Sequence, residues 1–298
     1  MMLTLAALTT QFLERPGLAV KTVRSYEFTL LPLLSEYGST PIEILTRPTL
    51  EAYLNDLTHL AYTTHQRHQA ILQALLNFAV DQGHLKANPI ARLKHRKPNP
   101  DKGEHGSDAS IRYLTPEQLQ LLYQVVQIDV RMTALVSLLH RTGVRISELL
   151  AVDLEQVDLR PRKFRVVGKG NKQRWCFYSP DTAEALAKYL KYYRHASSPA
   201  LFTAQQPKSG KVGRLSYDAA YRCWKSLIEL QPQIVGARLH DLRHTFATER
   251  VGLMGIEELR ALMGHENIQT TLRYQKVTSQ RAEMVAHQAL GALIQSKN

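Results

Sequence analysis

The sequence predicts a mainly α-helical fold with one small antiparallel β-sheet, in two parts joined by a linker. Three observations carry this prediction. Apolar side chains recur at three- and four-residue spacing through most of the chain, which is typical of helices with one buried face. A single stretch, 163–178, alternates apolar and polar residues as a β-hairpin does. The segment 98–110 contains no Leu, Ile, Val or aromatic residue, so it is expected to be a linker.

The first part, residues 1–97, is predicted to be a bundle of four or five helices. Three sets of apolar residues each share one helical face: Val23, Tyr26, Leu30 and Leu34; Leu50, Tyr53, Leu54 and Leu57; and Ile71, Leu75 and Phe78. Thr64 is expected to cap the third of these helices, and Gly83 follows its expected end.

The second part, residues 113–298, follows a linker placed at 98–112. It opens with Thr115-Pro116-Glu117-Gln118, which is a capping box with proline at the first helical position. The hairpin strands are predicted at Lys163–Val167 and Gln173–Tyr178, around a glycine-rich turn. The two tryptophans and two cysteines are expected to be buried: Trp175, Trp224, Cys176 and Cys223.

Composition narrows the function. The 298 residues include 38 Lys and Arg against 26 Asp and Glu, so the net charge is +12 and an anionic partner such as nucleic acid is expected. Residues 1–112 carry 12 basic and 10 acidic side chains, whereas residues 113–298 carry 26 and 16. Two cysteines exclude a disulfide scaffold, and no CxxC pair supports a zinc framework. No apolar run approaches the roughly 18 residues of a membrane span, so we expect a soluble, cytoplasmic protein without membrane contact.

Four segments of the second part carry side chains that are able to take part in catalysis. Arg145 begins a helix after a Gly turn, and Lys169 lies between two glycines at the hairpin tip. His240 and Arg243 share a helix face, and His265 and Tyr274 follow near the end. Each one alone is more often structural: an arginine that pairs, a turn lysine, a core histidine, a packing tyrosine.

The combination is more specific than its parts. In chain order, TGxRxSEL, GKGxKxR, HxLRHxFAT and LxGHxxIxTTxxY closely resemble the tyrosine recombinase (phage integrase) family. The resemblance covers most of the chain and looks like the compact two-domain Xer type. It implies a SAM-like core-binding domain at 1–97 and a mixed α/β catalytic domain at 113–298 with a C-terminal tail helix. Met263, where leucine is usual, is a minor departure.

The resemblance carries over to individual residues. It implies that the catalytic residues are Arg145, Lys169, His240, Arg243, His265 and Tyr274, with Glu148 as an accessory acid. Two guanidiniums suit the charge that builds on a phosphodiester during attack, and the Tyr274 hydroxyl is the implied nucleophile. His240 is expected to accept its proton and Lys169 to protonate the leaving 5′ oxygen. No cofactor or metal is implied.

The expected activity is site-specific recombination of double-stranded DNA through a 3′-phosphotyrosyl intermediate and a Holliday junction, in integration, excision or resolution. The resemblance implies a clamp on DNA, a homotetramer on two DNA sites, tail docking on a neighbouring protomer, a place at the nucleoid and a possible partner recombinase or accessory protein. DNA contacts are expected at helix starts and basic clusters: Lys21, Arg24, Thr64, Arg67, Lys94, Arg96, Lys172 and Arg174. The tail's apolar residues are Met284, Val285, Leu290, Leu293 and Ile294.

The same residues are also compatible with two alternative functions and with one alternative site. A type IB topoisomerase-like nicking-closing enzyme shares the Arg, Lys, His and Tyr chemistry, and a DNA-binding protein without chemistry is the third candidate. A zinc site could be built from His240, His244 and His265. Asp241 stands where the HExxH motif has glutamate, which disfavours zinc. His244 is therefore expected to support the helix or the site rather than to bind metal.

Overall fold

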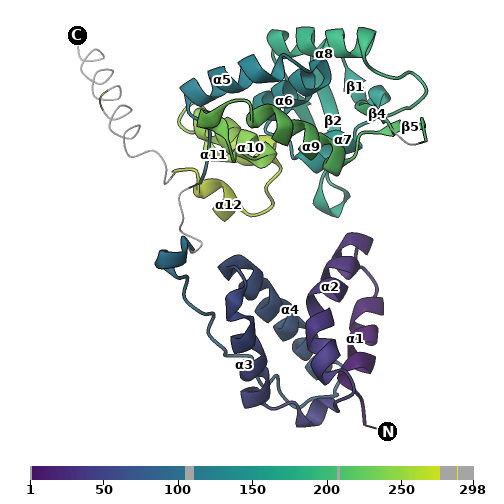
Figure 1. Ribbon diagram of the computed structural model, residues 1–298, viewed down its shortest axis with the longest axis vertical. Coiled ribbons are helices and arrows are strands. Elements are labelled where there is room, and N and C mark those ends of the chain that lie inside the picture. The colour runs from purple at the N-terminus through teal and green to yellow at the C-terminus, as the bar shows by residue number, and fades with distance from the viewer. Residues whose placement is uncertain (1, 105–110, 207–208, 276–286, 288–298) are drawn as a thin grey trace. The chain divides into compact units, whose positions relative to one another are not determined.

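The computed structural model describes residues 2–104, 111–206, 209–275 and 287, except for the side chain of Lys169. It is mostly helical, as the sequence predicts, and it has two small antiparallel sheets where one was predicted (Figure 1). The chain divides into two compact units, Met1–Ala109 and Ser110–Asn298. Each unit has its own hydrophobic core. No helix within the described stretches is both long enough and apolar enough to span a bilayer.

Four α-helices and three short 3₁₀ turns form the first unit. They are α1 (Leu5–Glu14), α2 (Val20–Tyr37), η1 (Ile42–Ile44), α3 (Arg47–Asp56), η2 (Leu57–His59), α4 (Tyr62–Asp81) and η3 (Pro100–Lys102). Most residues of the three predicted apolar faces lie inside: Leu30, Leu50, Tyr53, Leu54, Ile71 and Leu75 are buried. Burial of these side chains provides most of the free energy that holds such a bundle together, because isolated helices of this length are marginal in water.

The predicted cap of α4 is wrong. The helix begins at Tyr62, two residues before Thr64, and Ala61 occupies the N-cap without a side-chain hydrogen bond. The carboxylate of Glu104 replaces the cap, since it accepts a hydrogen bond from the Tyr62 N–H at 2.9 Å. A carboxylate at a helix N-terminus also interacts favourably with the helix dipole. Sequence spacing did not reveal this contact because it joins residues 42 positions apart.

Helices dominate the second unit. They are α5 (Pro116–Val126), α6 (Val130–Thr142), α7 (Ile146–Ala151), α8 (Pro180–Tyr192), α9 (Tyr217–Ile228), α10 (Leu239–Arg250), α11 (Ile256–Met263) and α12 (Ile268–Leu272), with 3₁₀ turns η4 (Leu154–Gln156), η5 (Lys169–Asn171) and η6 (Pro232–Ile234). The predicted capping box of α5 is present: Thr115 Oγ1 accepts from the Gln118 N–H, and Gln118 Oε1 accepts from the Thr115 N–H. Helices α6 and α10 pack against each other and contribute buried residues to the hydrophobic core of the second unit.

The predicted hairpin is present as β2 (Lys163–Val167) and β3 (Gln173–Phe177), paired antiparallel with Arg165 opposite Trp175. Strand β1 (Val157–Asp158) extends this sheet, and β4 (Thr203–Gln205) with β5 (Val212–Arg214) forms a second one. The second sheet was not predicted, because its strands have only three residues each.

The expected burial of Trp175 is wrong, whereas that of Trp224 is confirmed. Alternation along β3 turns Cys176 inward, so Trp175 lies on the outer face, 43% exposed, with the Lys163 ammonium over its ring. Cys176 is buried, and Cys223 is half-buried at the edge of the core. Both are free thiols.

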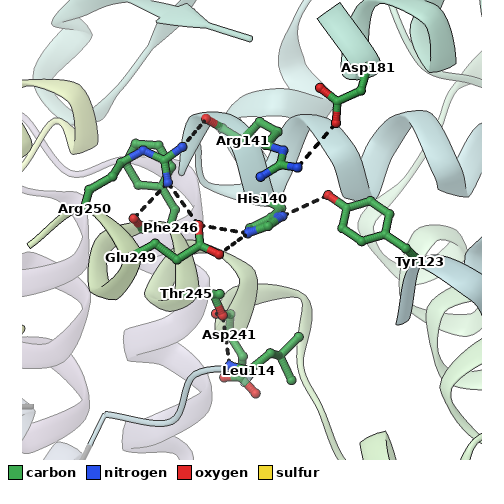
Figure 2. Close-up of polar contacts among 10 residues, drawn as sticks. All are labelled: Leu114, Tyr123, His140, Arg141, Asp181, Asp241, Thr245, Phe246, Glu249 and Arg250. Carbon is green, nitrogen blue, oxygen red and sulfur yellow. Dashed lines mark hydrogen bonds and ion pairs between the residues drawn. The ribbon is translucent and has the colours of Figure 1, made fainter. Parts of the chain in front are cut away.

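The start of the second unit is tied to α10. The Leu114 N–H donates to Thr245 Oγ1 at 2.9 Å, and that hydroxyl donates to the Asp241 carbonyl at 2.8 Å (Figure 2). Arg112 forms an ion pair with the buried Asp241 carboxylate at 3.5 Å. The predicted tail residues Met284, Val285, Leu290, Leu293 and Ile294 lie outside the described residues.

Candidate active site

Two arginines from distant segments meet at the Gly143 turn. Gly143 ends α6 in the left-handed conformation, with φ of 62°, and Arg145 follows as the N-cap residue of α7. Arg243 projects from α10 and is 2% exposed; it donates to the Gly143 carbonyl at 2.5 Å and to the Met263 carbonyl at 2.7 Å. Burial and the nearby charge of Arg145 lower the pKa of Arg243 to about 10, so it remains a cation at neutral pH. Both guanidiniums are thus fixed around one turn.

The Glu148 carboxylate lies between the guanidiniums of Arg145 and Arg174. It accepts from Arg145 Nη1 at 2.9 Å and from Arg174 Nη2 at 2.6 Å, and it also caps the Arg145 N–H. Burial acts to raise the pKa of Glu148, but the hydrogen bond and charge of Arg174, with the contribution of Arg145, bring that pKa below its ordinary value. Arg174 in turn donates from Nε to the Leu262 carbonyl. Glu148 therefore fixes Arg145 and joins it to the hairpin.

Two histidines, His244 and His265, contact Tyr274, and His240 lies beside His244. His240 and His244 lie one turn apart on α10 with their rings edge to face, and the His265 ring is parallel to that of Tyr274 at 6.3 Å. Nδ1 of His265 is hydrogen-bonded to Thr271 Oγ1 at 2.9 Å. Burial first, and then nearby positive charge, lowers the pKa of all three: to about 4 for His244 and about 3 for His265. At neutral pH these rings are uncharged.

Tyr274 itself is 3% exposed and follows α12. Its hydroxyl lies 2.8 Å from Nδ1 of His244. Burial raises the pKa of this phenol above 10, against the opposing charges of Arg243, Arg273 and Arg145. The hydroxyl is therefore protonated at neutral pH and needs an acceptor for its proton if it is to attack.

A cavity of about 500 Å³ opens beside these groups. Its lining combines the half-exposed Arg145, the buried His265 and the hairpin. The remaining lining residues include Lys172, Arg174, Arg260, Asn267 and Thr270. Four cationic side chains of this lining, against the one acid Glu266, make it suited to an anionic group such as a phosphate.

The three predicted basic residues of the hairpin lie in different environments. The backbone of Lys169 lies in η5, where Gly170 has a φ of 70°, and the Lys169 side chain lies outside the part that the structure describes. Lys172 is exposed and forms an ion pair with Glu266 at 3.1 Å. Arg174 is only 12% exposed at its side chain and faces Glu148. The disfavoured zinc alternative gains no support, since among the described residues no group of three or more ligating side chains has the arrangement to hold an ion.

The candidate DNA-contacting side chains of the first unit differ in exposure and in how far hydrogen bonds hold them. Lys21, Arg24, Thr64 and Lys94 have exposed side chains. Arg67 is exposed but donates across to α2, at the Ser25 carbonyl and hydroxyl. Arg96 is held most firmly: both of its terminal nitrogens donate to the Glu104 carboxylate, at 2.6 and 2.7 Å, and one also donates to the Leu60 carbonyl.

With this geometry in place, comparison with known proteins identifies the family. Residues 112–281, more than half of the chain, match the phage integrase family. The chain belongs to the phage integrase family. Site-specific recombination, by breaking and rejoining DNA strands, is the activity of this family and so of this chain. The match favours recombination over the nicking-closing and binding-only alternatives.

Relatives and solved structures agree with this assignment. The recombinase is 31% identical to tyrosine recombinase XerC of Haemophilus influenzae over 73% of this chain and 72% of the relative. It is 29% identical to XerC of Lactobacillus delbrueckii subsp. bulgaricus over 87% and 89%. Its fold is similar to a Tn1549 transposon integrase solved with a circular intermediate DNA, with a TM-score of 0.76, 20% identity and coverage of 96% and 99%. A lambda integrase dimer bound to a COC′ core site gives a TM-score of 0.69 at 16% identity, over 92% of this chain and 77% of the other.

The recombinase brings Arg145, Glu148, His240, Arg243, His265 and Tyr274 into one region of the second unit. Sequence reasoning missed the direct contact of His244 with the Tyr274 hydroxyl and the carbonyl partners of Arg243. The spacing of four between His240 and His244 was a usable signal for the first, because it places both rings on one helix face. Nothing local in the sequence identifies a carbonyl partner.

Proposed function

We propose that the Tyr274 hydroxyl attacks the scissile phosphate of duplex DNA. The new bond joins the tyrosyl oxygen to phosphorus, and the bond to the 5′ oxygen breaks, which leaves a 3′-phosphotyrosyl linkage and a free 5′ hydroxyl. The observation that carries this proposal is the position of Tyr274, whose ring stacks with His265 and whose hydroxyl contacts His244 beside the fixed Arg243. A 5′ hydroxyl from a second strand reverses the step, so no energy source is required.

The surrounding groups have separate roles in this proposal. Arg145 and Arg243 stabilise charge on the non-bridging oxygens, where planar guanidiniums offer paired donors. His265 adds a hydrogen bond, and Glu148 positions Arg145. His240 accepts the phenolic proton while His244 orients the hydroxyl; the lowered pKa of His240 keeps its ring neutral and able to accept. Lys169 donates the proton that the leaving 5′ oxygen takes up.

The two units have complementary roles in the same proposal. Residues 1–97 bind DNA through Lys21, Arg24, Thr64, Arg67 and Lys94, residues 98–112 connect the units, and residues 113–298 cleave. The net positive charge of the second part favours contact with DNA phosphates. We also propose a tetramer on two DNA sites, with exchange through a Holliday junction, acting in the cytoplasm at the nucleoid. The DNA complexes of the Tn1549 and lambda integrases support the DNA partner.

Covalent trapping tests the nucleophile. The target site is first obtained by selecting bound fragments from the DNA around the gene, and the site is then nicked so that the cleaved end diffuses away. Wild-type protein should give an SDS-resistant adduct that mass spectrometry places on Tyr274, and Tyr274→Phe should bind equally and give none. An adduct on another residue, or one that persists in Tyr274→Phe, would refute the assignment.

The roles of the cations need a second comparison. Arg145→Ala and Arg243→Lys should each reduce adduct formation by at least about 100-fold, because a lost preorganised donor costs about 3 kcal/mol in such sites. DNA affinity should change much less. A substrate with sulfur in place of the leaving oxygen needs no proton donor, so it should restore cleavage by Lys169→Ala but not by Arg145→Ala.

A further inference from the structure

A network of polar side chains around the buried His140 lies behind the active site and has no part in the chemistry above. His140 on α6 is 1% exposed and has two partners (Figure 2). Its Nδ1 lies 2.8 Å from the hydroxyl of Tyr123 on α5, and its Nε2 lies 3.1 and 3.2 Å from the two carboxylate oxygens of Glu249 on α10. One imidazole thus links three helices, including the helix that carries His240 and Arg243.

The hydrogen bonds that join Tyr123, His140 and Glu249 have defined donors and acceptors. A carboxylate only accepts, so Nε2 of His140 carries the proton that faces Glu249. Burial raises the pKa of Tyr123 to about 12, so its hydroxyl remains a donor. Burial acts to raise the pKa of Glu249 as well, but the hydrogen bond and charge of His140, with Arg250 and Arg141, bring it below the ordinary value. The His140–Glu249 contact is therefore charge-assisted, which makes it stronger than a neutral hydrogen bond.

The contact continues through Arg250 to the active-site turn. Arg250 bonds the Glu249 carboxylate and the carbonyls of Phe246 and Arg141, and its guanidinium stacks 3.9 Å from the centre of the Phe246 ring (Figure 2). The Phe246 ring in turn fills the space beside Gly143, where an added Cβ would lie only 2.3 Å from it. The Gly143 carbonyl is the acceptor for Arg243.

We propose that His140 is a positioning residue for strand cleavage, which holds α10 against the end of α6 so that Arg243 and Arg145 keep their common geometry at Gly143. The inference rests on the proposed role of Arg243. A displacement of about 1 Å at such a site lowers the rate by up to about 100-fold, whereas the DNA-facing surface is unchanged. Loss of the contact should therefore slow cleavage much more than it weakens binding.

Matched hydroxyl deletions separate positioning from simple loss of stability. Tyr123→Phe removes the hydroxyl that contacts His140. Tyr189→Phe is the control, since it removes a fully buried hydroxyl on α8 that is bonded to Thr203 and takes no part in the His140 hydrogen bonds. Single-turnover adduct formation at saturating protein should slow about 5-fold in Tyr123→Phe and less than 2-fold in Tyr189→Phe, with DNA affinity within 2-fold in both.

Substitutions of His140 itself supply the stronger test. His140→Ala should lower the cleavage rate by about 50-fold. His140→Gln, whose amide can donate to Glu249, should cleave at least about 5-fold faster than His140→Ala. Hydrogen exchange of the α10 amides should be faster in His140→Ala than in Tyr189→Phe, a readout that does not require cleavage. Equal cleavage and exchange in all four variants would overturn the proposal, as would a rate loss that follows the unfolding midpoint alone. Absence of any wild-type adduct on Tyr274 would instead refute the proposed function, and exchange would still decide the role of His140.

Discussion

The Tyr274 hydroxyl is hydrogen-bonded to Nδ1 of His244 rather than to His240. Burial lowers the pKa of His244 to about 4, so at neutral pH its ring is uncharged and its Nδ1 is the acceptor of this hydrogen bond, while the proton stays on the phenol. The bond fixes the rotation of the hydroxyl, the group that aligns with phosphorus in the proposed attack. His244 therefore has a defined task in the site that its place in the sequence motif did not reveal.

Substitutions of His244 should report this task. His244→Ala should slow adduct formation by about 10- to 100-fold, the usual range for loss of a positioned catalytic partner. His244→Asn places an amide oxygen near the former Nδ1 and should recover most of the rate. His244→Gln places its amide near the former Nε2 and should not. Single-turnover kinetics on the nicked substrate measure all three, and equal rates for Asn and Gln would contradict the role of Nδ1.

Gly143→Ala should damage both stability and cleavage. The residue has a positive φ, which costs an alanine about 1–2 kcal/mol, and the new methyl group would meet the Phe246 ring, which adds about 1–3 kcal/mol. We expect a loss of about 3 kcal/mol in the free energy of unfolding, measured in urea, and a slower cleavage step because the acceptor of Arg243 moves. Gly213→Ala is the control, since nothing lies within 4 Å of its added Cβ and its φ is not positive. Equal losses in the two variants would show that the turn is not special.

The Glu148 carboxylate should stabilise the second unit only while it is charged. Its pKa in the folded protein is below the ordinary 4.5, so the stability it provides is present above pH 4.5 and is lost as pH falls through the folded value. Glu148→Gln should lower the free energy of unfolding at pH 7 by about 3 kcal/mol, because two guanidiniums lose a buried partner. The difference between variant and wild type should shrink below pH 4.5. A difference that is constant with pH would mean that charge is not its source.

Much of this architecture could be predicted from the sequence, because it depends on local patterns. Alternation placed the hairpin within one residue of Lys163–Val167 and Gln173–Phe177, and the capping box marked the start of α5 at Pro116. The motifs also pointed to Arg145, Arg243 and His265, which lie near Tyr274. Contacts that depend on tertiary packing could not be predicted in this way. The Met263 carbonyl that accepts from Arg243 is an example, because its position depends on where α11 ends, and no spacing rule predicts that.

Burial was the weaker inference for the same reason. Trp175 was expected to be buried, but the register of β3 with β2 decides which face it occupies. Thr64 was expected to cap α4 on the basis of its type, but an acceptor from residue 104 allowed the helix to begin at Tyr62. In both instances a tertiary contact outweighed the local preference.

The histidines predict how the second unit responds to acid. The pKa values of about 3 for His265 and about 4 for His244 lie below the unfolded value of 6.5, so between these limits the unfolded chain binds more protons. Stability should therefore fall as pH drops below 6.5. His265→Asn, whose amide can still bond Thr271, should flatten this decline between pH 6.5 and 5, measured by urea unfolding. His195→Asn, at a half-buried position away from the site, should leave it unchanged.

The last prediction concerns the predicted linker, whose first residues are folded onto the helical unit. Glu104 accepts from Arg96, from the Asn99 N–H and from the Tyr62 N–H at the start of α4. The Arg96 hydrogen bond, followed by that of Asn99, lowers the pKa of Glu104 to about 2. Glu104→Gln weakens all of these contacts, so residues 98–104 should detach.

Limited trypsin digestion measures this detachment at the Lys102–Gly103 bond, just before Glu104. Cleavage after Lys102 should be at least about 5-fold faster in Glu104→Gln than in wild type, because proteolysis follows the population of the locally opened chain. Asp101→Asn is the matched control: it also removes one negative charge, but its carboxylate lies outside the Glu104 contacts. If that control were cleaved as fast as Glu104→Gln, net charge rather than the Glu104 anchor would set the accessibility of this segment.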